Sequence, residues 1–259
     1  HGAENAIRKF VMIGDYKQLP AVVQQTEEES EVREESLRAI GLNNCRQSLF
    51  ERLIRLNPDG EVVYMLSSQG RMHHDIADFP NQAFYGNLLT EVPLEHQLRP
   101  IPYRTRSASP LLQLLSCRRV SFLPVRKEKR IRDELSFSDK TNLQEAQIIA
   151  QLVDAVWQLY AENGLRFDAA ESVGVIVPYR HQISTIRKEL ELLNRPELLN
   201  ITIDTVERFQ GSQRDIIIYG FTVSKEYQLD FLTNNCFVED GQIIDRKLNV
   251  ALTRARESM

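Results

Sequence analysis

The side chains best suited to chemistry in this chain stand just after short apolar runs. A glutamine can orient an attacking water, and an arginine can neutralise the charge of a phosphoryl group during its transfer. A glycine lets backbone N–H groups approach an anion closely. The candidate residues of these types, with their neighbours, are Asp15, Gln18, Arg71, Pro178, Tyr179, Thr205, Gln210 and Gly211. Together they predict chemistry on a phosphate group.

A second pattern of this kind is LNVALTRAR, which spans Leu248 to Arg256. Its apolar residues repeat at helical spacing, so we expect a short helix that carries both Arg254 and Arg256. At about 100° per residue, Arg254 lies well away from the centre of the apolar side of that helix. We therefore expect Arg254 to face a cleft rather than the core.

The apolar runs predict the elements that position these residues. They are rich in β-branched and aromatic residues with little polar alternation, as parallel strands buried on both faces are. We expect strands over 10–14, 62–66, 173–177, 201–203 and 215–221. Apolar residues at helical spacing predict helices from Asn142 to Tyr160 and from Gln182 to Leu193. The expected fold is an α/β parallel sheet.

Ligands of an open parallel sheet bind beyond the carboxyl ends of its strands. We therefore expect the polar residues that follow the apolar runs to converge on one edge of the sheet. One such strand end would be weak evidence, whereas four in order, followed by the arginine pattern, indicate a shared site.

The composition limits the class of protein. With 259 residues and 42% hydrophobic content, the chain can bury a large core as one big domain or as one domain plus pieces of another. Its net charge of −4 argues against a protein that coats nucleic acid through bulk charge. Any contact with nucleic acid must then come from local basic patches.

Two segments are unusually charged. Residues 26–35 hold six glutamates, which is typical of a solvated loop or helix face, with a partner site as the minor alternative. Seven basic residues lie between Arg118 and Arg132. They could follow a phosphate backbone, although such runs are more often solvated surface.

The remaining sequence signals concern the compartment and metals. Three widely spaced cysteines fit free thiols, and neither a signal peptide nor an apolar run near about 18 residues is present. We expect an intracellular, cytoplasmic protein, with the nucleus possible in a eukaryote, and no membrane partner.

His73 and His74 point in different directions if they lie on a helix, so we expect them to form no metal site. Because the chain opens at His1 rather than Met, we expect an excised or incomplete piece.

The ordered motifs resemble a known family. GDYKQLP, QGRMHHDI, VGVIVPYRHQ, TIDTVERFQGSQRDIII and LNVALTRAR resemble motifs III, IV, Va, V and VI of superfamily 1 helicases. The resemblance is closest to the 5′-to-3′ group, which includes the nonsense-decay RNA helicase and the replication helicase-nuclease. It implies two RecA-like domains with ATP between them and single-stranded nucleic acid across their top. Residues 1–55 would then be a remnant of the first domain, and 56–259 the second.

By position, four residues resemble the catalytic residues of these helicases. Gln18 resembles the motif III glutamine that senses the γ-phosphate, and Asp15 would couple that sensing to domain movement. Arg71 and Arg254 resemble the two arginine fingers that approach the γ-phosphate when the cleft closes. Such a donor is worth several powers of ten in rate.

The same resemblance assigns binding roles. The residues expected at ATP are Gln18, Arg71, Gln210, Gly211, Gln213 and Arg254. Thr205 resembles the residue that contacts the nucleic-acid backbone. Pro178 and Tyr179 resemble the motif Va pair beside the strand, where a ring stacks on a base, although a packing role for Tyr179 is almost as consistent with the sequence.

Three departures from the family pattern matter. Gly70 stands where many relatives carry a tyrosine against the adenine, and Gln213 stands where a glutamate is common. No glycine of the chain is followed by Lys, so a Gly-Lys-Ser/Thr phosphate loop is absent, as is an Asp-Glu pair after a buried strand. The Mg²⁺ ligands would lie upstream, and we expect this piece alone to hydrolyse no ATP.

The sequence thus predicts the C-terminal motor domain of an ATP-dependent helicase that acts with ATP and Mg²⁺. The alternative is a non-catalytic nucleic-acid-binding module or scaffold derived from a helicase. Expected partners are the first RecA-like domain of the same protein and single-stranded nucleic acid. DNA is somewhat favoured over RNA, although we identify no reader of a 2′-hydroxyl.

Overall fold

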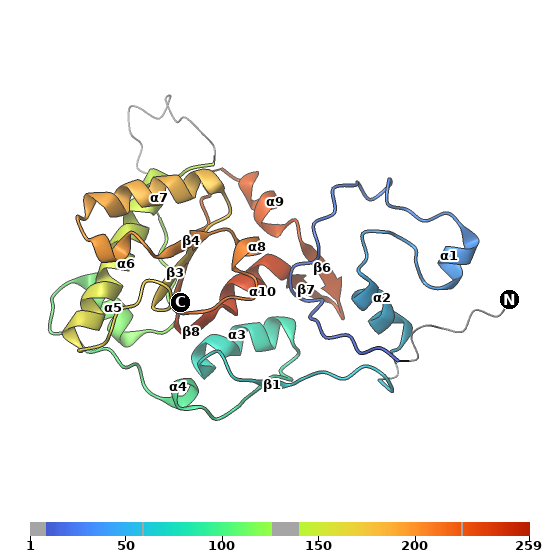
Figure 1. The fold of residues 1–259 in the computed structure, drawn as a ribbon, viewed down its shortest axis with the longest axis horizontal. Coiled ribbons are helices and arrows are strands. Elements are labelled where there is room, and N and C mark those ends of the chain that lie inside the picture. The colour runs from blue at the N-terminus through green and yellow to red at the C-terminus, as the bar shows by residue number, and fades with distance from the viewer. Residues whose placement is uncertain (1–8, 59, 126–139, 224) are drawn as a thin grey trace. The chain divides into compact units, whose positions relative to one another are not determined.

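The computed structural model describes residues 9–58, 60–125, 140–223 and 225–259 (Figure 1). The chain divides into two compact units, His1–Leu66 and Ser67–Met259. The sequence motifs predict a boundary near residue 55 instead. We describe each unit by itself.

A four-stranded parallel sheet forms the centre of the second unit. Its strands are β3 (Val173–Ile176), β4 (Thr202–Asp204), β5 (Arg214–Tyr219) and β8 (Ala255–Ser258), in the order β4-β3-β5-β8. Neighbours pair in parallel, with Gly174 opposite Thr202 on one side and Ile217 on the other. This confirms the predicted α/β parallel sheet.

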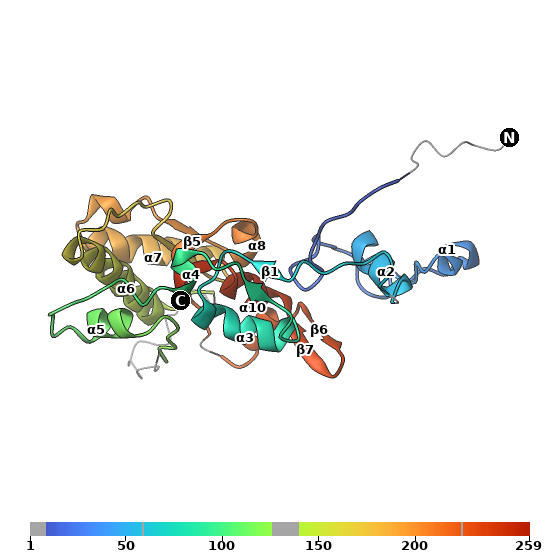
Figure 2. The same cartoon turned by 90° about the horizontal axis from the view of Figure 1, so that it is seen from below.

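Helices α5 (Pro110–Cys117), α6 (Leu143–Glu162) and α7 (Arg180–Leu192) cover one face of that sheet. Helix α6 begins as expected, because the Asn142 side chain accepts a hydrogen bond from the Glu145 N–H and caps the first turn. Figure 2 shows α6 and α7 alongside each other. The main core forms where they meet Val173, Val175 and Val177.

The opposite face carries α8 (Val206–Phe209), which packs with α10 (Arg246–Leu252) and, through it, α3 (His74–Phe84). Gly174 makes the close approach of α8 possible. A Cβ at this position would lie 3.0 Å from the Phe209 ring and 2.9 Å from Arg214 Cγ. The two helical layers therefore enclose the sheet on both faces.

Smaller elements surround this core. They are β1 (Ser68–Gln69) paired with β2 (Thr90–Glu91), the short helices α4 (Glu95–Leu98), α9 (Gln228–Thr233) and η2 (Pro196–Leu198), and the antiparallel hairpin of β6 (Cys236–Glu239) and β7 (Gln242–Asp245).

The first unit holds α1 (Glu35–Ala39) and α2 (Leu49–Leu56), with a single β-bridge between Glu31 and Asn44. The predicted strands over 10–14 and 62–66 are wrong in this structure. These runs are irregular and exposed, with Ile13 88% and Leu66 81% accessible. A strand needs a neighbour for its backbone hydrogen bonds, and the described part of this unit pairs only through that bridge.

The predicted arginine helix also needs correction. Helix α10 ends at Leu252, Arg254 lies beyond it, and Arg256 belongs to strand β8. The backbone carbonyl of Arg254 accepts the Arg214 N–H at 3.0 Å, and that of Arg256 accepts the His73 N–H at 2.8 Å. Tertiary hydrogen bonds of the strand therefore replace continuation of the helix.

Other sequence features have mixed outcomes. The glutamates of 26–35 are exposed. In the basic cluster, Arg119 is buried in an ion pair with Glu257, and the five members from Arg126 to Arg132 lie outside the described residues. Within the described ranges, no helix is both long and apolar enough to cross a membrane, and no group of three His, Cys, Asp or Glu residues is suited to a metal ion.

Candidate functional site

Arg71 is held by two acceptors from distant parts of the second unit. It follows β1, and its Nε donates to Gln213 Oε1 at 3.0 Å while its Nη1 donates to the Thr253 carbonyl at 2.9 Å. Burial lowers the pKa of its guanidinium, although arginine keeps its charge at neutral pH. The side chain is thus a fixed positive charge at the start of β5.

Arg254 lies beside Arg71 through the same threonine. Its Nη2 donates to Thr253 Oγ1 at 2.9 Å, its Nε to the Val250 carbonyl at 3.0 Å and its Nη1 to the Ser212 carbonyl at 3.5 Å. The side chain is only 2% exposed, so it does not face an open cleft as the helical spacing predicted. The acceptors of its own unit hold it inward, and its catalytic role stays a prediction.

The turn between α8 and β5 completes this group. Gly211 has φ of +86°, a left-handed conformation that glycine adopts without strain. Ser212 fixes the turn because its N–H and its hydroxyl both donate to the Phe209 carbonyl. We call Arg71, Gln213, Thr253 and Arg254 the arginine cluster. It combines two guanidinium groups with a glycine turn, which suits phosphate oxygens.

The arginine cluster lies at the amino ends of β5 and β8, because Gln213 directly precedes β5 and Arg254 directly precedes β8. Tyr179 and Thr205 instead follow β3 and β4. The expected convergence on one sheet edge is therefore wrong. A parallel strand must start at the edge opposite to the one where its predecessor ended, so the segment after β4 crosses back before β5 begins.

The carboxyl ends carry the residues predicted to contact nucleic acid. Strands β3 and β4 are neighbours in the sheet, so the residues that follow them lie at adjacent strand ends. Thr205 is half-buried, and its carbonyl accepts the N–H groups of Arg208 and Phe209 as α8 begins. Tyr179 is half-buried and its ring stacks on Phe231, with centroids 4.9 Å apart.

The motif III pair belongs to the first unit and forms a turn. Asp15 Oδ2 accepts the Gln18 side-chain amide at 2.9 Å, and Asp15 Oδ1 accepts the Lys17 N–H at 3.0 Å. The carboxylate therefore fixes the direction of the glutamine side chain. Gln210, the remaining expected ligand of ATP, is exposed directly before Gly211.

Comparison with known proteins decides the family. A family model described as "AAA domain" matches residues 45–259, which is most of the chain. The chain belongs to this AAA domain family.

The relatives of this AAA domain chain are named as helicases. It is 28% identical over 99% of its length to "DNA polymerase alpha-associated DNA helicase A" of Saccharomyces cerevisiae, of which it covers 34%. It is 29% identical over 97% of its length to "Helicase sen1" of Schizosaccharomyces pombe, and 27% identical over 97% to "DNA replication ATP-dependent helicase/nuclease DNA2" of Xenopus laevis. It covers 13% and 22% of these two proteins. The resemblance to superfamily 1 helicases of the 5′-to-3′ group is confirmed, and the chain spans about a third or less of these relatives.

The AAA domain structure adds residues that the sequence analysis missed. Thr253 joins both arginines, and its position inside the LTRAR pattern was the available signal. Arg256 pairs with Asp215 at 3.2 Å between β8 and β5, which gives it a structural role. Burial raises the pKa of the Asp215 carboxyl, and Arg256 lowers it. Glu257 is a buried charge on β8 paired with Arg119 at 3.0 Å.

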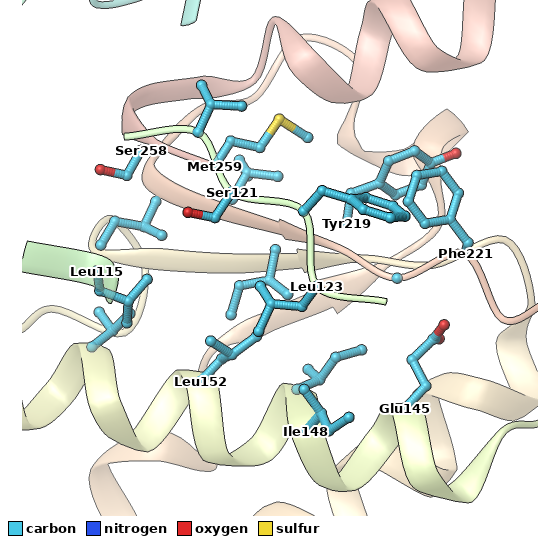
Figure 3. Close-up of a pocket in the computed structure, with 18 of the residues that line it drawn as sticks. Leu115, Ser121, Leu123, Glu145, Ile148, Leu152, Tyr219, Phe221, Ser258 and Met259 are labelled. Atoms are coloured by element: carbon cyan, nitrogen blue, oxygen red, sulfur yellow. The ribbon is translucent and has the colours of Figure 1, made fainter. Parts of the chain in front are cut away.

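A cavity of about 240 Å³ lies between α6 and β5, apart from the arginine cluster (Figure 3). Its lining is mostly apolar and includes Leu123 and Leu152. Glu145 lines its polar part and is buried, so its carboxyl has a raised pKa, although it accepts hydrogen bonds from the Thr222 N–H and hydroxyl. Such a lining does not suit a nucleotide phosphate.

Proposed function

We propose that this chain is the C-terminal motor part of a nucleic-acid helicase that couples ATP hydrolysis to movement along a single strand. The observation that supports this most is that Arg71 and Arg254 share Thr253 beside the Gly211 turn. The Arg71 guanidinium and the fixed turn at Gly211 form a preorganised surface for a transferring phosphoryl group, and Arg254 holds the segment behind them.

The arrangement of Arg71 suits the role of an arginine finger. Two fixed acceptors hold its Nε and Nη1, and no partner within the described ranges takes its Nη2. A guanidinium that is already oriented needs little reorganisation when charge develops on the phosphoryl group. Arg254, bonded to the Ser212 carbonyl, would keep the motif VI segment fixed against the motif V turn.

The donor set fits the phosphates of ATP but not a Mg²⁺ ion. Arginine and backbone N–H groups bind phosphate oxygens, whereas Mg²⁺ takes carboxylate and water oxygens, and the described residues offer no such cluster. Bound Mg²⁺ would neutralise negative charge on the phosphates of ATP. We infer that its ligands lie in the first RecA-like domain, to which we assign residues 1–55 with the Asp15–Gln18 turn.

ATP hydrolysis by the natural full-length protein tests this proposal. We expect turnover that single-stranded nucleic acid stimulates, and we expect Arg71→Ala to lower it about a thousandfold. The matched control is Arg187→Ala, an exposed arginine on α7. Equal turnover by Arg71→Ala and the control would contradict the role of Arg71. No turnover by the wild-type protein with any strand would favour the non-catalytic module.

We propose single-stranded nucleic acid as the polymer and favour DNA slightly, because two of the relatives above carry DNA in their names. Unwinding of matched DNA and RNA duplexes with 5′ or 3′ tails would decide the polymer and the polarity. Faster unwinding of the 5′-tailed DNA duplex is expected, and a preference for RNA would overturn the choice of DNA.

A further inference from the structure

Helix α9 presents an aromatic ring beside Tyr179 at the carboxyl end of the sheet. The Phe231 ring lies 4.9 Å from the Tyr179 ring with an interplanar angle of 23°, so the two are stacked. Phe231 is 40% exposed and Tyr179 is half-buried. Part of the surface of both rings therefore remains accessible to solvent.

Lys247 of α10 fixes Phe231 in two ways. Its ammonium donates to the Phe231 carbonyl at 2.7 Å and lies 4.0 Å from the centroid of the Phe231 ring. Lys247 is only 4% exposed, so the contact is a largely desolvated cation–π interaction, the stronger kind. Tyr179, Phe231 and Lys247 therefore form one column across three elements, which we call the aromatic column.

The loop before α9 is also held in place. Thr222 has φ of +52° and is buried, and its N–H donates to Glu145 Oε2 at 2.8 Å. Its hydroxyl donates to Glu145 Oε1 at 3.0 Å. The chain that leaves β5 is thus anchored to the first turn of α6, which restricts where α9 can lie.

The surroundings contain both charge signs. Arg180, His181 and Lys225 are exposed near the column in sequence, and so are Glu226 and Asp230. The net electrostatic attraction between this surface and the phosphates of a nucleic-acid strand is therefore weak, and ring stacking must supply the binding energy. Stacking of a base on an aromatic side chain tolerates any sequence because every base has a π-face.

We propose that Tyr179 and Phe231 form a platform whose outer ring, Tyr179, stacks on a base of the single strand, and that Phe231 and Lys247 hold that ring in position, because Phe231 itself is covered by Tyr179 and Lys247. This rests on the proposed function, and it adds Phe231 and Lys247 as positioning residues for the Tyr179 ring. Thr205, at the neighbouring strand end, would contact the backbone of the same strand.

Binding of fluorescent single-stranded oligonucleotides to the natural full-length protein tests the platform. We expect Phe231→Ala to weaken binding about tenfold, because the Tyr179 ring loses the support that orients it and one stacked base is worth about 1 to 3 kcal/mol. Phe231→Leu keeps the apolar volume, which favours folding, and should weaken binding similarly, whereas Phe231→Tyr should bind like the wild type. The matched control is Leu229→Ala, a 47% exposed residue on the same helix.

A strand with a tract of abasic nucleotides separates stacking from a general structural effect. It keeps the phosphates and removes the bases, so the ratio of wild-type to Phe231→Leu affinity should fall from about ten to near one. If the wild type binds ordinary strands and Phe231→Leu binds them equally, the platform is wrong and the proposed function stands. An unchanged ratio on the abasic tract also overturns the platform, and absence of wild-type binding to any strand overturns the proposed function itself.

Discussion

The arginine cluster and the aromatic column lie at opposite ends of the same parallel sheet and are built differently. In the cluster, guanidinium groups are fixed by carbonyl, amide and hydroxyl oxygens, such as Thr253 O and Ser212 O. In the column, rings and a buried ammonium are fixed by stacking, as between Tyr179 and Phe231. The first arrangement suits charge that develops during a reaction, and the second suits a ligand that keeps its charge.

One short segment joins the two ends. Thr205 follows β4 at the carboxyl end and Gln213 precedes β5 at the amino end, with α8 between them. A bound nucleic-acid strand that shifts Thr205 would therefore also shift the turn that holds Arg71. We therefore expect a substitution in the arginine cluster to change ATP turnover and one in the aromatic column to change affinity for a single strand. A substitution at Gly174, against which α8 packs, should change both.

The largest effect is expected for Arg254→Ala. Turnover of the full-length protein should fall by about a thousandfold or more, while its affinity for a single strand stays within about twofold, since Arg254 is remote from the column. Arg254→Lys should also lose turnover, because the single nitrogen of an ammonium cannot reach acceptors that are bonded by three separate guanidinium nitrogens. Steady-state ATP hydrolysis and fluorescence anisotropy measure the two properties. A parallel loss of strand affinity would break the proposed separation.

A smaller effect on both ends is expected for Gly174→Ala. Its Cβ would lie 2.9 Å from Arg214 Cγ and 3.0 Å from the Phe209 ring, so the Arg214 side chain must move and the ring of α8 must give way. Overpacking of this kind typically costs about 1 to 3 kcal/mol. Urea denaturation should show the loss, and both turnover and strand affinity should decline. The control is Gly70→Ala, which would meet only Leu94 Cδ1 at 3.4 Å and should keep wild-type stability. Wild-type stability of Gly174→Ala would show that α8 yields easily.

The smallest effect concerns pH and the buried side chain of His73. Burial lowers the pKa of His73, whose Nδ1 accepts the Asp75 N–H at 3.1 Å while its Nε2 donates to the Arg99 carbonyl at 3.0 Å. The folded state therefore keeps a neutral ring at a pH where the unfolded state binds a proton. The stabilising contribution is present above about pH 6.5 and is lost as the pH falls through the lowered folded pKa.

For His73, this loss cannot exceed about 1.4 kcal/mol per pH unit. Chemical denaturation between pH 7.5 and 5.5 should show a shallower slope for His73→Gln than for the wild type. His74→Gln, in which an exposed histidine is replaced, should keep the wild-type slope. Equal slopes for all three proteins would show that the His73 side chain does not contribute to the pH dependence of stability.

Much of the second unit follows from local sequence patterns. The run Val173–Val177 is β-branched and apolar, and it forms the buried strand β3. The helix predicted from Asn142 begins there because that side chain caps its first turn. The motif resemblance also singled out Arg71 and Arg254, which the structure brings to one threonine.

The same reasoning failed where pairing decides the outcome. The run at 10–14 resembles the run at 173–177 in composition, yet Ile13 is 88% exposed and the segment forms no strand. Composition indicates that a segment suits a strand, but the hydrogen bonds of a neighbouring strand make it one. Similarly, residues 248–256 have helical spacing, and pairing with β5 turned the end of that segment into β8.

Composition and spacing along the chain predicted the parallel sheet and the residue types available to bind phosphate and a single strand, whereas the ordered motifs indicated the family. The tertiary structure alone decided that the arginine cluster and the aromatic column lie at opposite sheet ends, and that Thr253, Phe231 and Lys247 belong to them. Contacts of this kind join residues far apart in sequence, and they depend on the direction in which the chain crosses between strands, which no local pattern records.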